Sequence, residues 1–74
     1  MLDQWEAILN VIVNGDDKTI EAGATVADLV HLLELEGKRI AVELNMEIVP
    51  RSEHPTTTLS QGDKLEIVHA IGGG

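Results

Sequence analysis

The sequence contains no cysteine, phenylalanine or tyrosine, and Trp5 is its only tryptophan. The lack of cysteine excludes a disulfide framework, a thiolate nucleophile and a thiolate metal site. So few aromatic rings leave no platform on which nucleic-acid bases could stack. No apolar run is long enough to span a bilayer, and the acidic start "MLDQWEAILN" lacks the basic segment of a signal peptide. We therefore expect a cytoplasmic protein.

Positive charge is also scarce, because 5 Lys and Arg residues stand against 13 Asp and Glu residues, for a net charge of -8. A field of this sign repels the phosphates of nucleic acid and an anionic membrane surface. It would favour encounter with a protein partner that carries a basic surface. The charge could equally serve only to keep a small protein soluble. The composition predicts no binding to nucleic acid or membrane and leaves a basic protein partner open.

The apolar part of the chain is aliphatic. Hydrophobic residues make up 43% of the 74 residues, which predicts a single domain with a core of Ile, Leu and Val. A domain of this size buries only about 60% of the surface of its unfolded chain, so we expect modest stability. We assign residues 1–7 to an N-terminal extension, 8–71 to the folded domain and 72–74 to a flexible glycine tail.

The first half of the chain predicts a hairpin followed by a helix. Residues 8–13, "ILNVIV", lead into "NG" at 14–15, a strong hairpin signal, with a return strand at about 17–21. Apolar residues then recur at helical spacing from 26 to 33. Thr25 and Asp28 form the capping box expected at a helix start, and Gly37 provides the expected stop.

The second half predicts three more strands. "RIAVELN" alternates apolar and polar residues, "EIVP" is a shorter strand, and "RSEHPTTTLSQGD" is a loop with at most one turn of helix. In the final strand, "KLEIVHAI", Leu65 and Ile67 share a face opposite Val68 and Ala70. This order predicts a two-layer α+β fold, a mixed sheet with one helix packed across one face. If the last strand lies beside the first, the C-terminus leaves the sheet at its end.

Conventional sites are not apparent. His31, His54 and His69 are widely spaced and have no cysteine to complete a metal site, so we expect surface histidines and no bound metal. Ser52 and Ser60 lack the glycines of a nucleophile elbow. We therefore expect a protein that is not an enzyme.

The terminal glycines are the strongest candidate for chemistry. Chain ends are usually poorly ordered, so Gly72, Gly73 and Gly74 could be an inert end. An α-carboxyl ordinarily has a pKa of roughly 3.3–3.7, however, and its carboxylate can attack an activated phosphate. Glycines also let an extended backbone enter a narrow channel of a partner enzyme.

An apolar patch is expected beside this tail. Val68 and Ala70 would lie on the open face of the sheet, and together with Ile71 they could dock a partner. In the alternative interpretation, the N-terminal residues, including Trp5, cover this face.

Four segments together, "VIVNG", "TVADLV", "AVELNMEIVPRS" and "GDKLEIVHAIGGG", resemble the sulfur carrier proteins of thiamine biosynthesis, the ThiS family. The resemblance covers about residues 9–74 and implies the ubiquitin-like β-grasp fold with a flexible Gly-Gly tail. Residues 1–7 extend beyond the usual first strand of the family. The third glycine is also additional, so Gly73 and Gly74 match the family's terminal pair.

The resemblance implies that an E1-like adenylating enzyme uses ATP to adenylate Gly74. Sulfur obtained through a cysteine desulfurase would convert the adenylate into a thiocarboxylate, which would donate sulfur to thiazole synthase. The protein would be a consumed and recharged cosubstrate without a bound cofactor, and a monomer when free. Alternatives are a sulfur carrier for molybdopterin synthesis, a ubiquitin-like protein tag, and a β-grasp interaction module with inert glycines.

Overall fold

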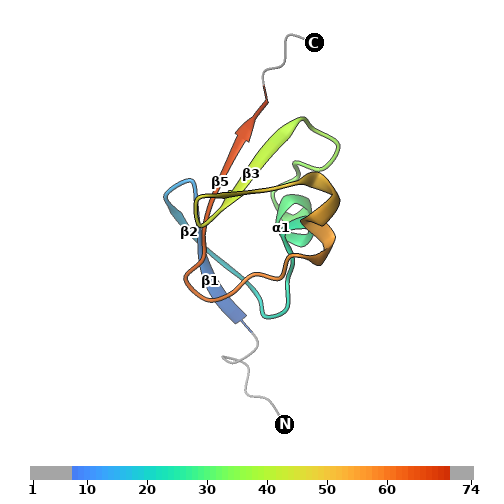
Figure 1. The fold of residues 1–74 in the computed structure, drawn as a ribbon. Coiled ribbons are helices and arrows are strands. Elements are labelled where there is room, and N and C mark those ends of the chain that lie inside the picture. Colours follow the sequence, from blue (N-terminus) through green and yellow to red (C-terminus); the bar gives the residue numbers. More distant parts are fainter. Residues whose placement is uncertain (1–7, 71–74) are drawn as a thin grey trace.

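The computed structural model describes residues 8–70, which form one mixed sheet with a helix across one face (Figure 1). The sheet has five strands in the order β2-β1-β5-β3-β4. The elements in chain order are β1 (Ile8–Val13), β2 (Asp16–Glu21), α1 (Val26–Leu32), β3 (Ile40–Leu44), β4 (Glu47–Val49), the 3-10 helix η2 (Arg51–Thr56) and β5 (Lys64–His69). The predicted two-layer α+β architecture is confirmed.

The last strand lies in the middle of the sheet. β5 runs parallel to β1, with Val13 opposite Leu65, and antiparallel to β3, with Val42 opposite Ile67. β2 forms one edge of the sheet and β4 the other. Because β1 and β5 are parallel neighbours, the start of β1 and the end of β5 lie at opposite ends of the molecule (Figure 1).

Both hairpins turn through two consecutive residues with positive φ. Asn14 and Gly15 have φ of 52° and 87°, and Asn45 and Met46 have φ of 50° and 73°. Two such residues are the requirement of a type I′ turn, whose twist matches that of the flanking strands. The "NG" prediction is confirmed, whereas the second turn places an unbranched but bulky Met where glycine is favoured.

The start of α1 is held by the predicted capping box. The Asp28 N–H donates to Thr25 Oγ1 at 3.2 Å, and the Thr25 N–H donates to Asp28 Oδ2 at 2.9 Å. These two bonds satisfy backbone donors that have no partner within a helix.

The predicted helix stop at Gly37 is wrong, because α1 ends at Leu32. Glu34 adopts a left-handed conformation with φ of 60°. The Leu35 N–H then donates to the Val30 carbonyl at 2.9 Å, and the Glu34 N–H donates to the His31 carbonyl at 3.0 Å. This pair of bonds is a Schellman motif, which is normally closed by glycine. Here Leu35 packs against the core next to the helix end, and this contact favours the early termination.

The core lies between the sheet and α1 and consists of aliphatic side chains, as predicted. Leu29 and Val26 of the helix are almost completely buried against Val11, Val42 and Leu65 of the three central strands. The other buried apolar residues are Val13, Ile20, Val30, Val49, Leu59 and Ile67.

The segment after β4 departs from the prediction in two ways. It contains six residues of 3-10 helix, Arg51–Thr56, rather than at most one turn. His54, expected on the surface, is buried at 8% exposure, and its Nε2 lies 3.1 Å from the Val49 carbonyl oxygen. A buried imidazole needs such a partner, and Val49 precedes the helix and provides it.

Candidate functional site

The end of β5 brings part of the predicted site to the surface. Val68 is 57% exposed and Ala70 is exposed, whereas Leu65 and Ile67 face the core. The predicted division of the two faces of this strand is therefore confirmed. Ile71 and the three terminal glycines lie outside the described residues, so their predicted roles stay predictions.

One edge of this strand end is tied to the neighbouring β3. His69 is opposite Ile40, and beyond it the Ala70 N–H donates to the Arg39 carbonyl at 2.9 Å. The Arg51 guanidinium donates to the adjacent Lys38 carbonyl at 2.8 Å. Residues distant in sequence thereby hold the point from which the chain leaves the sheet. No sequence pattern indicated the contact of Arg51, apart from its place in the family-like segment "VPRS".

The other edge of β5 is fixed by a turn. The Asn14 side chain bonds to both backbone groups of Ile67, as donor from Nδ2 at 3.0 Å and as acceptor at Oδ1 at 2.8 Å. Sequence reasoning identified Asn14 as a turn residue but missed this second role. The sequence could have indicated the contact between Asn14 and Ile67 only if the strand order had been known, because 53 residues separate the partners.

The open face of the sheet is apolar near the tail and acidic beside it. Val68 lies opposite Ala41, and Glu43 lies opposite both Glu66 and Ile48, which is 71% exposed. Two like charges directly opposite each other on neighbouring strands oppose folding. This pair therefore does not stabilise the fold, and it gives the open face a local negative charge.

The exposed histidines differ in their surroundings. His31 Nδ1 lies 2.8 Å from Glu36 Oε1, and this hydrogen bond, together with the charge of Glu36, raises the pKa of His31. His69 is exposed on β5, as predicted. Within residues 8–70, no group of three or more His, Asp or Glu side chains is arranged to hold a metal ion. The helices of this same part of the chain are too short to cross a bilayer.

This arrangement, with a central parallel pair β1–β5 and a single helix across a mixed sheet, defines a β-grasp protein of the ubiquitin-like class. The profile of the ThiS family matches residues 7–74. The chain belongs to the ThiS family.

Individual relatives agree with this assignment. The sulfur carrier protein ThiS of Bacillus subtilis is 38% identical over 63 residues, which are 84% of this chain and 96% of the relative. The crystal structure of the thiamine biosynthesis protein ThiS from Geobacter metallireducens has a TM-score of 0.75 at 32% identity, covering 89% of this chain and 100% of that chain.

A second kind of relative is much longer. A thiazole synthase of Paramagnetospirillum magneticum is 41% identical over 66 residues, which are 89% of this chain but only 20% of that protein. A thiazole synthase of Magnetococcus marinus is 35% identical, again over 20% of its length. The chain thus spans about a fifth of these two relatives.

Proposed function

We propose that this protein carries sulfur for the biosynthesis of thiamine, on the α-carboxyl group of Gly74. An E1-like enzyme adenylates that carboxylate with ATP, and the product is converted into a thiocarboxylate. Thiazole synthase then receives the sulfur. The protein is consumed and recharged in this cycle and does not itself catalyse a step.

The chemistry requires an activated carboxylate. The carboxylate oxygen attacks the α-phosphate of ATP and pyrophosphate leaves, which gives a mixed anhydride with AMP as a good leaving group. A sulfur nucleophile at the oxidation level of hydrosulfide adds to the carbonyl carbon and displaces AMP, and the thioacid loses its proton. A cysteine desulfurase supplies this sulfur indirectly, as a persulfide from which a thiol releases hydrosulfide while a disulfide forms between the two thiol sulfurs.

The observation that carries the proposal is the position of β5. It is central in the sheet, its two edges are bonded to Asn14 and Arg39, and its last described residues are exposed. A fixed strand end limits the directions in which the following residues can extend, which favours entry of a glycine tail into a partner.

We assign the docking of partners to Val68, Ala70 and Ile71. Support for an apolar contact comes from the exposure of Val68 and Ala70, and support for a basic partner surface from Glu43 and Glu66 beside them. The likeness to part of two thiazole synthases favours that enzyme as one partner, because in those proteins a similar segment belongs to the same chain.

Intact-mass measurement tests the proposal. The full chain is incubated with ATP, inorganic sulfide and an E1-like adenylating enzyme, and we expect one oxygen to be replaced by sulfur. A variant without Gly72, Gly73 and Gly74 should keep the thermal stability of the parent chain while giving neither pyrophosphate nor the sulfur product. If Gly74 is not adenylated, the proposal is wrong.

The acceptor is tested separately. The thiocarboxylate form should bind thiazole synthase and transfer its sulfur, whereas a chain ending in an unmodified carboxylate should transfer none. Sulfur transfer to a molybdopterin precursor but not to thiazole synthase would replace this proposal with the molybdopterin alternative.

A further inference from the structure

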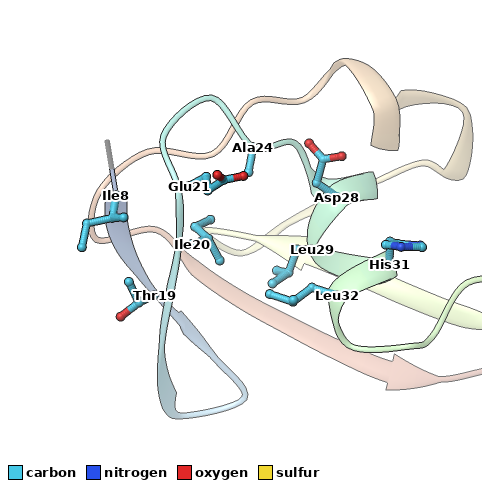
Figure 2. Close-up of a pocket in the computed structure, with 9 residues that line it drawn as sticks. All are labelled: Ile8, Thr19, Ile20, Glu21, Ala24, Asp28, Leu29, His31 and Leu32. Atoms are coloured by element: carbon cyan, nitrogen blue, oxygen red, sulfur yellow. The ribbon is translucent and has the colours of Figure 1, made fainter. Parts of the chain in front are cut away.

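A groove of about 430 Å³ lies between β2 and α1, away from the end of β5. Figure 2 shows Ile20 of β2 and Leu29 and Leu32 of α1 pointing toward one another across it. Ile20 and Leu29 are buried, but Leu32 is 59% exposed. Ile8, which is 49% exposed, lines the same groove from the start of β1. The groove therefore presents apolar surface that the described residues leave uncovered.

Chain connectivity places one segment at this groove. Ile8 is the first described residue, so residues 1–7 join the fold at the edge of the groove. Trp5 is three residues from Ile8, and an extended chain spans at most about 3.3–3.6 Å per residue, so the two Cα atoms lie within about 11 Å. We propose that residues 1–7 dock in the groove between β2 and α1, with Trp5 as the side chain that fills it.

Chain geometry also excludes the open face around Val68 as a docking site for Trp5. Ile12 is level with Lys64 in the parallel pair, so Val68 is eight residues along the strand direction from Ile8. At roughly 3.3 Å per residue this amounts to about 26 Å, more than twice the reach from Ile8 to the Cα of Trp5. Trp5 therefore cannot cover Val68.

The chemistry of the groove suits an indole. Its floor is apolar, while Thr19, Glu21 and Asp28 place hydroxyl and carboxylate oxygens around the lining. A tryptophan ring buries roughly 150–250 Å² of surface and has a single N–H donor at its edge. Trp5 is the only aromatic residue of the chain, so an apolar groove next to it has no competing aromatic occupant.

The test uses Trp5 as the sole fluorophore of the intact chain. We expect its emission maximum to lie at a shorter wavelength than in the same chain unfolded in urea. Acrylamide should also quench its fluorescence less in the folded chain than in the unfolded chain. Leu32→Asn should abolish the blue shift. The matched control is Ile48→Asn, which removes an even more exposed apolar side chain from β4, outside the groove, and should leave emission unchanged. Circular dichroism should report the native fold for both variants.

Three results would overturn the inference. Trp5 emission equal to that of the unfolded chain would show that no apolar site receives it. An equal response to Leu32→Asn and Ile48→Asn would place it elsewhere. A blue shift that disappears on dilution would assign the groove to Trp5 of a second copy. None of these results depends on adenylation of Gly74, so failure here is distinguishable from failure of the proposed function.

Discussion

The side-chain amide of Asn14 forms two hydrogen bonds with the backbone of Ile67, at 3.0 Å to its carbonyl and 2.8 Å from its N–H. The amide thus replaces the strand residue that would otherwise pair with β5 beyond the end of β1. One asparagine both turns the first hairpin and fastens the strand that leads to the tail.

Replacing Asn14 by Gly should keep the positive φ of the turn and remove only these two bonds. We expect a loss of about 1–2 kcal/mol in the free energy of unfolding, measured by urea denaturation. Asn14→Ala should cost about 1 kcal/mol more, because alanine also tolerates a left-handed backbone poorly. Wild-type stability of the Gly variant would show that the contact with Ile67 contributes nothing.

Replacing Met46 by glycine should increase the stability of the protein. Its φ is 73° and its side chain is 92% exposed, so Met46→Gly removes backbone strain with almost no loss of packing. We expect a gain of about 1 kcal/mol in unfolding free energy. Glu47→Gly, at the next position but within β4, serves as the control and should destabilise the protein. A loss of stability in Met46→Gly would contradict the strain argument.

The His31–Glu36 pair should make stability depend on pH. Glu36 raises the pKa of His31 by a hydrogen bond to the imidazolium and by its charge. Because the folded pKa lies above the unfolded one, this contribution is complete below about pH 6.5 and is lost as pH rises through the raised value.

Glu36→Gln should therefore lower stability most between about pH 5 and pH 6.5 and little at alkaline pH. In an NMR titration the pKa of His31 should fall in this variant. Glu34→Gln, which removes the same charge from the same loop, should leave His31 closer to its parent value. Equal shifts in the two variants would mean that the specific pair is not the cause.

Val68 should contribute to the binding of partner proteins and not to the stability of the fold. Val68→Glu places a charge on the open face, and we expect kcat/KM for adenylation to fall roughly tenfold. Full burial of a Val contributes about 1.5–3 kcal/mol, and docking would bury only the 57% of Val68 that is still exposed. Met46→Glu introduces the same charge at the other end of the sheet and controls for the overall field. An equal loss in both variants would show that net charge, not docking, is responsible.

Much of the fold was predictable because its signals are local. The turn at Asn14 and Gly15 requires residues that tolerate positive φ, and the capping box requires only Thr25 and Asp28, three residues apart. The alternation that placed Leu65 and Ile67 in the core also follows from strand geometry alone.

The errors arose where a distant contact overrides a local preference. Gly37 is the better stop signal, yet α1 ends earlier at a left-handed Glu34, because Leu35 packs against the core there. His54 reads as a polar loop residue, but the 3-10 helix turns it inward toward the Val49 carbonyl. Neither outcome is encoded in a short pattern.

By itself, then, the sequence determined the hairpin, the start of the helix, the aliphatic core and the resemblance to the ThiS family, because each depends on neighbouring residues or on a motif. Only the tertiary structure decided how the root of the tail is held and which surfaces stay open. Asn14 and Ile67, or Arg39 and Ala70, meet because β5 inserts between β1 and β3, and this pairing joins residues far apart in the chain. Likewise, the parallel register of β1 and β5 separates Ile8 from Val68, so the start of β1 and the end of β5 lie at opposite ends of the sheet.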